Sequence, residues 1–256
     1  MELAFERRGA GAPLILIHGI GHHWQGWLPV MDRLAASRTV IAIDLPGFGD
    51  SPELPDGTPY TAESLADAVE SFCALLGVRE PHVAGNSLGG YIALELASRG
   101  VVRTAAALSP VAFWSRSELL YCQSMLRALR ASARAMPPER TAMAVENPVL
   151  RALSAGLLVA RPSRLEPTAL PAAIQALGRA SGFDETLESF AGLMPPAPPK
   201  SPITIAWGER DRLLPRRQAV RAARWSGRRV KLLKGCGHLP MSDDPELVAR
   251  VILGAG

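Results

Sequence analysis

Short apolar runs alternate with helical patterns along most of this chain, and this order restricts its possible folds more than any other feature. Apolar runs typical of buried strands lie at residues 14–17, 39–43, 82–85, 102–108, 203–207 and 230–233. Amphipathic patterns typical of helices lie at residues 27–36, 61–76, 88–98 and 246–253. Consecutive parallel strands need a crossover between them, which is usually a helix. We therefore expect an α/β protein with a mostly parallel central sheet flanked by helices.

One long segment interrupts the alternation. Residues 113–194 contain no convincing strand, but they contain helical patterns at 119–135, 139–153 and 171–179. The proline-rich stretch 195–202 follows. Because proline-rich chain is extended and rather stiff, it suits a connection that returns to the sheet. The sequence predicts a core made of residues 1–112 and 195–256, with residues 113–194 inserted as a helical cap.

Composition argues against a membrane or secreted protein. The chain has no apolar run near the roughly 20 residues that a membrane-spanning helix needs. Met1–Arg8 includes acids where a secretion signal carries bases, and no long apolar stretch follows. Cys73, Cys122 and Cys236 show no paired or metal-binding spacing, which favours reduced thiols. We expect a cytoplasmic protein without a membrane partner.

The net charge of +4 raises the question of nucleic-acid binding. Only three of the 28 basic residues are lysine, and no basic run has aromatic residues interleaved. The sequence also shows no nucleic-acid-binding motif. We expect no nucleic-acid partner, and the oligomeric state is left open.

The segment Gly85–Gly89 has the pattern G-x-S-x-G, between a predicted strand and a predicted helix. A serine on a tight strand-to-helix turn needs small neighbours, and the glycines supply them. Its hydroxyl would lie at a helix N-terminus, where the amides and the helix dipole favour developing negative charge. Ser87 is therefore the candidate nucleophile.

A serine hydroxyl needs a positioned base. Of the five histidines, His238 lies in a glycine-rich loop directly after the last predicted strand, where its ring can reach across the sheet. His82 begins a strand and His18 ends one, so both are predicted to be structural. His238 is the candidate base.

The acid that supports the base is expected at a strand end between the serine and the histidine. The segment Trp207–Pro215 follows the penultimate predicted strand and supplies Asp211, with Glu209 as a nearby competitor. The strand that ends at Leu108 is followed by Ser109, Pro110 and Val111, without a carboxylate. Asp211 is the candidate acid.

Five motifs in this order resemble the α/β-hydrolase fold superfamily, in particular its serine esterases (carboxylesterases) with a helical lid. They are His18–Gly21, Asp44–Ser51, Gly85–Gly89, Trp207–Asp211 and Gly237–Pro240. The resemblance implies a nucleophile elbow at Ser87 and a Ser-His-Asp catalytic triad. It also implies an oxyanion hole formed by the backbone N–H groups of Ile20 and Leu88, a lid over the site, and structural roles for Asp44 and Ser51.

The activity expected from this resemblance is hydrolysis of carboxylic esters, or related acyl compounds, of small molecules through an acyl-enzyme. No metal or organic cofactor is expected. Hydrolysis of carbon–carbon bonds in ring-cleavage products is an alternative, although those enzymes often carry a tryptophan shortly after the catalytic histidine, where this chain has Leu239–Met241. A small-molecule receptor that retains the triad is an alternative from a different class.

Five further residues are candidates for the substrate pocket. They are His22, His23, Trp24, Phe113 and Trp114. Of the two adjacent histidines, we expect one to face the pocket and the other solvent. The stretch between Ser115 and Leu165 contains eight arginines and only three glutamates, so the cap carries a positive net charge. This charge either steers anionic substrates to the site or belongs to a solvated surface.

Overall fold

The computed structural model describes residues 1–137, 143 and 147–255, and a seven-stranded sheet lies at its centre. The strand order is β1-β3-β2-β4-β5-β6-β7. β1 pairs with β3 in antiparallel orientation and every other neighbouring pair is parallel, so the predicted mostly parallel sheet is confirmed. The strands are β1 (Phe5–Arg8), β2 (Pro13–Ile17), β3 (Thr39–Ile43), β4 (His82–Asn86), β5 (Thr104–Leu108), β6 (Ile203–Gly208) and β7 (Lys231–Leu233).

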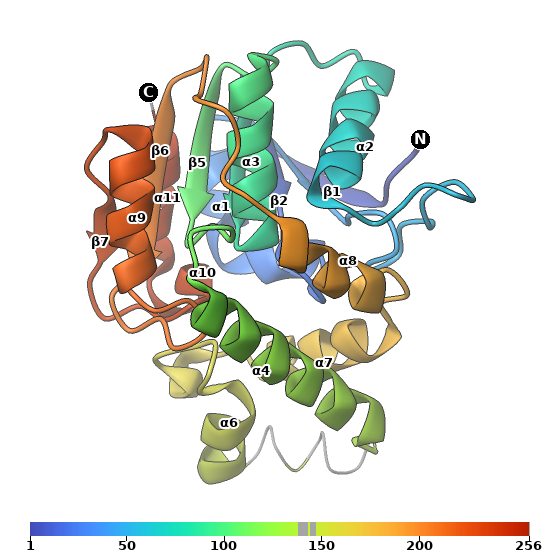
Figure 1. Ribbon diagram of the computed structural model, residues 1–256, viewed down its shortest axis with the longest axis vertical. Coiled ribbons are helices and arrows are strands. Elements are labelled where there is room, and N and C mark those ends of the chain that lie inside the picture. The colour runs from blue at the N-terminus through green and yellow to red at the C-terminus, as the bar shows by residue number, and fades with distance from the viewer. Residues whose placement is uncertain (138–142, 144–146, 256) are drawn as a thin grey trace.

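Helices cover both faces of the sheet, as Figure 1 shows. Alternate residues of each strand point to opposite faces. Ile15 and Ile17 of β2 therefore pack with α2 and α3, whereas Leu14 and Leu16 pack with α1 and α11. The helices that flank the sheet are α1 (Leu28–Ala35), α2 (Ala62–Leu75), α3 (Leu88–Arg99), α9 (Arg217–Ser226) and α11 (Pro245–Leu253).

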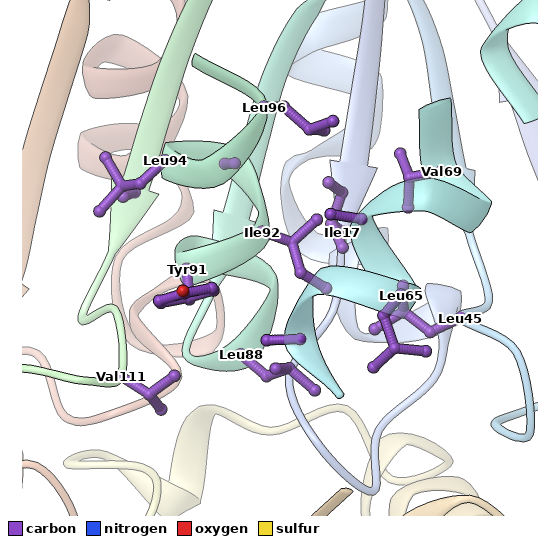
Figure 2. Close-up of a cluster of buried hydrophobic side chains, with 14 of the residues drawn as sticks. Ile17, Leu45, Leu65, Val69, Leu88, Tyr91, Ile92, Leu94, Leu96 and Val111 are labelled. Atoms are coloured by element: carbon purple, nitrogen blue, oxygen red, sulfur yellow. The ribbon is translucent and has the colours of Figure 1, made fainter. Parts of the chain in front are cut away.

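The larger core cluster holds α2 and α3 against the sheet. Figure 2 shows Ile92 of α3 pointing toward α2, among Ile17 of β2 and Leu65 of α2. All three side chains are completely buried. Burying a side chain of this size contributes about 1.5 to 3 kcal/mol to folding. The same packing fixes the first turn of α3 relative to β2, and both elements contribute to the candidate site.

Helices also lie across the end of the sheet toward which β5 points (Figure 1). They connect β5 to β6 and comprise α4 (Arg116–Ala135), α6 (Pro148–Ala155), α7 (Ala169–Arg179) and α8 (Phe183–Ser189). The predicted helices 119–135 and 171–179 are present in α4 and α7. The predicted helix 139–153 falls partly on residues outside the described ranges, and α6 accounts for its described end. No helix among the described residues is both long and apolar enough to cross a membrane.

The chain order of the strands changes direction between β2 and β4. After β2 the chain pairs β3 on one side, and it then returns to place β4 on the other side. The connections that follow β2 and β4 therefore diverge in opposite directions. In open α/β sheets, ligands bind at such a point, outside the carboxyl ends of the strands. Residues 18–21 follow β2 and Ser87 follows β4, so both lie at this point of the sheet.

Candidate active site

Ser87 occupies the single residue between β4 and α3, and its backbone is strained. Its φ of 57° and ψ of −116° lie outside the regions that a residue with a side chain ordinarily adopts. Its N–H donates to the carbonyl of Leu108 at 2.9 Å, which fixes the turn to the neighbouring strand β5. Such strain costs on the order of 1 to 3 kcal/mol and persists only where the surrounding contacts enforce it.

The glycines on either side of Ser87 allow the turn to close. A Cβ atom on Gly85 would lie 1.9 Å from the carbonyl oxygen of Gly89. A Cβ atom on Gly89 would lie 2.1 Å from the carbonyl oxygen of Ile17 in β2. Both distances are far below van der Waals contact, and both obstacles are backbone atoms. The sequence pattern around Ser87 is therefore a packing requirement of the turn.

Asp211 and His238 form a buried hydrogen-bonded pair. Nδ1 of His238 lies 2.8 Å from Oδ2 of Asp211, and the two residues are 3% and 7% exposed. The other carboxylate oxygen of Asp211 accepts the N–H groups of Leu213 at 3.0 Å and Leu214 at 2.8 Å. Because Nδ1–H donates a hydrogen bond to the carboxylate, Nε2 is left as the basic nitrogen of the ring.

Asn86 joins the serine turn to the histidine loop. Its side-chain Nδ2 donates to the carbonyl of His238 at 3.0 Å and to that of Leu108 at 3.2 Å. The residue that precedes Ser87 therefore holds the backbone of His238 itself. Sequence reasoning missed Asn86, because it occupies a variable position of the G-x-S-x-G pattern and no other signal marks it.

Glu209, the competitor of Asp211, has a different role. Its carboxylate accepts the N–H of Gly235 at 2.9 Å and so closes the turn after β7. Asp211 is the carboxylate that contacts His238. The geometry thus separates two acids that lie only two residues apart in the sequence.

The loop after β2 lies against Ser87. A Cβ atom on Gly19 would lie 3.1 Å from Cβ of Ser87, so the peptide that carries the N–H of Ile20 borders the serine turn. Leu88 is the first residue of α3 and is completely buried. The N–H groups of the first turn of a helix have no partner within the helix. The two predicted oxyanion donors, Ile20 and Leu88, therefore lie on segments that border Ser87.

His18, Asp44 and Ser51 hold this loop in place. His18 bonds the carbonyl of Gly19 through Nδ1 at 2.7 Å and accepts the N–H of Leu45 through Nε2 at 2.9 Å. Burial lowers the pKa of His18 to about 3. Asp44 accepts the N–H groups of Trp24 at 2.6 Å and Asp50 at 2.9 Å, and Ser51 donates to its carbonyl at 2.7 Å. These contacts are internal to the loops, as expected of structural residues.

His22 and His23 stack on each other, with ring centroids 5.2 Å apart. His23 is only 7% exposed and His22 is partly buried, and the expectation that one ring faces the pocket and the other solvent stays a prediction. Burial, followed by the neighbouring ring of His23, lowers the pKa of His22 to about 4, and proximity to His238 lowers it further. Burial likewise lowers the pKa of His23 to about 4. His22 therefore lies close to the candidate base as a neutral ring.

The three aromatic candidates for the pocket pack in or against the two hydrophobic core clusters. Phe113 is 2% exposed and its ring lies 5.4 Å from that of Trp225. Trp114 lies 5.3 Å from Phe190. Trp24 packs with the core cluster on the α1 and α11 face of the sheet. Their contacts are those of ordinary core residues, and their role in a pocket stays a prediction.

The cap contacts the loop that carries Ile20. A Cβ atom on Gly21 would lie 2.4 Å from Leu177 of α7 and 3.1 Å from Phe183 of α8. Arg130 of α4 is buried beneath these helices and donates to the carbonyls of Leu177 at 2.5 Å and Ala180 at 2.6 Å. This arginine of the basic cap is therefore structural. Of the other charged cap residues counted in the sequence, Glu139, Arg140 and Glu146 lie outside the described ranges.

The described residues give no grouping of three or more histidine, cysteine, aspartate or glutamate side chains that suits a metal ion. Cys73, Cys122 and Cys236 are all buried and free. Burial raises the pKa of Cys122 to about 12, and the nearby charge of Asp211 adds to that shift. The Cys122 thiol is therefore kept protonated.

Comparison with known proteins agrees with this geometry. The sequence model of the Alpha/beta hydrolase family matches residues 14–251. The chain therefore belongs to the alpha/beta hydrolase family, and membership implies a hydrolase.

Individual relatives differ in what they do. The chain is 31% identical over 242 residues to a dihydrolipoyllysine-residue acetyltransferase component of an acetoin cleaving system from Cupriavidus necator, covering 93% of this chain but only 62% of that protein. A 94-residue stretch is 44% identical to a 2-hydroxymuconate semialdehyde hydrolase from a Pseudomonas species, covering 36% of this chain and 33% of that one. The crystal structure of a bacterial membrane phospholipase A superposes with a TM-score of 0.76 at 28% identity, over 97% of this chain and 80% of that one.

Proposed function

We propose that this protein is a serine hydrolase that cleaves carboxylic esters, or related acyl compounds, of small molecules. The observation that carries the proposal is the buried pair of Asp211 and His238 at 2.8 Å, held by Asn86 beside the strained turn of Ser87. A scaffold has no need of a strained serine, a histidine with one free nitrogen and a buried acid on three adjoining loops. Pre-organised groups of this kind are typical of catalytic sites.

The mechanism follows from the roles that the geometry allows. Asp211 fixes the His238 tautomer, so that Nε2 takes the proton from the Ser87 hydroxyl as the oxygen attacks the ester carbonyl. The N–H groups of Leu88 and Ile20 would stabilise the oxyanion, and one such donor contributes about 3 kcal/mol to the transition state. His238 then protonates the leaving alcohol, and the acyl group stays on Ser87. Water, activated by the same ring, releases the acid. Every group that acts in these reaction steps, apart from the ester and water, belongs to the chain, so the proposed mechanism needs no cofactor.

The direct test is hydrolysis of p-nitrophenyl esters from acetate to decanoate by the wild type and by Ser87→Ala. We expect the substitution to lower kcat by about 10,000-fold or more, because the nucleophile is lost. Ser98→Ala, in the last turns of the same helix, is the matched control and should retain wild-type activity. The preferred acyl length measures the pocket. A wild type that cleaves no ester, or a Ser87→Ala variant as active as the wild type, contradicts the proposal.

Cleavage of carbon–carbon bonds is the second candidate, favoured by the similarity of a third of the chain to the 2-hydroxymuconate semialdehyde hydrolase. The same serine, histidine and acid could serve that reaction. The two activities are separated by comparing kcat/KM for the best ester with kcat/KM for a ring-cleavage product. Slow turnover of both, together with tight binding of a small molecule, would instead indicate a receptor.

A further inference from the structure

Asp243 joins the loop of the candidate base to the cap. It lies at the end of α10 (Pro240–Asp243) and is completely buried. Its Oδ2 accepts the N–H groups of Gly237 at 2.7 Å and Ala160 at 3.0 Å, and its Oδ1 accepts the N–H of Arg161 at 2.7 Å. Gly237 directly precedes His238, whereas Ala160 and Arg161 belong to the cap. One carboxylate therefore fixes the two segments to each other.

Further contacts connect the same stretch of the cap to the candidate triad. The N–H of Leu239 donates to the carbonyl of Leu158 at 2.9 Å, on the other side of His238. On the acid side, the guanidinium of Arg212 donates to the carbonyl of Gly156 at 3.0 Å. Residues 156–161, which we name the brace segment, thus contact the loops of both Asp211 and His238.

We propose that Asp243 is a positioning residue that orients His238 by locking its loop onto the brace segment. The inference rests on the proposed function, since it concerns the base of that reaction. The carboxylate holds the peptide before His238, the brace segment holds the peptide after it, and Asn86 holds its carbonyl. A displacement of about 1 Å at a catalytic group can cost about 100-fold in rate, so these bonds bear directly on catalysis. The brace segment of the cap therefore helps to hold the His238 loop in place.

Asp243→Asn tests the proposal without changing the shape of the side chain. An amide has one acceptor oxygen, and its NH2 group is a donor. Whichever way the amide faces, its NH2 meets at least one of the three N–H groups that the carboxylate accepts. The matched control is Asp244→Asn, which removes the same charge one residue further on. Asp244 caps α11 by accepting the N–H of Leu247 at 3.0 Å, and asparagine caps helices equally well.

The two variants are compared on an ester that the wild type cleaves, with rates divided by the number of active sites titrated. For Asp243→Asn we expect kcat to fall about 10- to 100-fold with KM nearly unchanged. Asp244→Asn should match the wild type in kcat and in KM.

A purely structural role would give a different result. Asp243→Asn would then unfold at a lower temperature but show the wild-type kcat per titrated site, and the proposal would be overturned. Labelling of Ser87 by a fluorophosphonate in the wild type tests the proposed function separately from the role of Asp243. A wild type that is neither labelled nor active contradicts the proposed function itself.

Hydrogen exchange of the wild type tests the brace segment without any variant. The amides of Ala160, Arg161 and Gly237 share one acceptor side chain, so we expect all three to exchange slowly and at similar rates. Rapid exchange at Ala160 and Arg161 in the fully active enzyme would overturn the proposal even if Asp243→Asn did not fold.

Discussion

Gly89 decides whether the turn around Ser87 can form against the sheet. In Gly89→Ala the new methyl group would meet two backbone oxygens of the β2 end, 2.1 Å and 2.5 Å away, which cannot move without breaking the strand. We expect a loss of about 2 to 4 kcal/mol in the free energy of unfolding. We also expect loss of most esterase activity, because α3 and the Ser87 turn must shift. Urea unfolding and ester hydrolysis measure the two effects.

Gly192→Ala is the matched control for this substitution. Gly192 has no atom within 4 Å of its would-be Cβ and no positive φ, so the alanine should be tolerated. Equal stability of Gly89→Ala and Gly192→Ala would show that the contact with β2 is not a constraint on the turn.

The order of motifs in the sequence predicted the candidate triad residues, but it did not predict the residues that hold them in place. Ser87, Asp211 and His238 each lie a short distance after an apolar run, and parallel strands bring their carboxyl ends to one edge. The structure places Asp211 within hydrogen-bond distance of His238, and their catalytic roles stay a prediction. Asn86 and Asp243 act through backbone groups of distant segments. Backbone acceptors and donors carry no residue type, so no sequence pattern reveals these bonds.

β1 and α9 are among the elements that the sequence interpretation missed, and both bury little apolar side chain. β1 reads Phe-Glu-Arg-Arg, contains no fully buried residue, and lies at the antiparallel edge of the sheet. α9 buries only Gln218, Ala219 and Ala222, while Val220 is 51% exposed. Periodicity finds the strands of the sheet centre and the large amphipathic helices, since those elements bury branched and aromatic side chains.

The first turn of α4 is anchored to α9 through Glu118, and this anchor is open to a stability test. Glu118 is 2% exposed, accepts the N–H of Ser115 at 2.6 Å, and pairs with Arg217 and Arg221. Burial raises the pKa of the carboxyl, but these hydrogen bonds outweigh it, so the net shift is downward. In Glu118→Gln the two arginines lose their charged partner. We expect the free energy of unfolding to fall by about 1 to 3 kcal/mol, measured by urea unfolding.

Glu188→Gln, at an exposed position of α8, removes the same charge as a control and should change stability by less than about 0.5 kcal/mol. If Glu118→Gln were as stable as this control, the buried ion pairs would add nothing to the attachment of the cap.

Folding of the molecule as a whole takes several titratable groups out of water near the site. His18, His22 and His23 have pKa values lowered from 6.5 to about 3, 4 and 4, mainly because burial disfavours the charged ring. Asp44 has its pKa raised from 3.8 to about 6, mainly by burial and against the bonds it accepts. The histidines are therefore neutral in the folded protein over a pH range in which the unfolded chain protonates them.

The sign of the resulting pH dependence can be worked out from these directions. Below pH 6.5 the histidines of the unfolded chain bind protons, whereas those of the folded protein stay neutral. The free energy of unfolding therefore falls as the pH falls toward 4. At pH 5 each histidine should cost the fold about 1 to 2 kcal/mol relative to pH 7. Asp44 acts in the opposite direction, because its folded form binds a proton as the pH falls through about 6. It offsets about one histidine, and the net loss is about 2 to 4 kcal/mol.

Thermal unfolding between pH 7 and pH 5 should therefore show a falling Tm, and the fall should be smaller in His23→Gln. Glutamine cannot take up a proton, so that variant removes one of the three groups while keeping a polar side chain of similar length. Because the burial of these histidines depends on the loop after β2 and on the packing of Leu177 and Phe183 over it, the slope reports on the assembled site and cap together. A Tm that stays constant or rises between pH 7 and pH 5 would mean that the rings are hydrated in solution and that the loop is not packed as described.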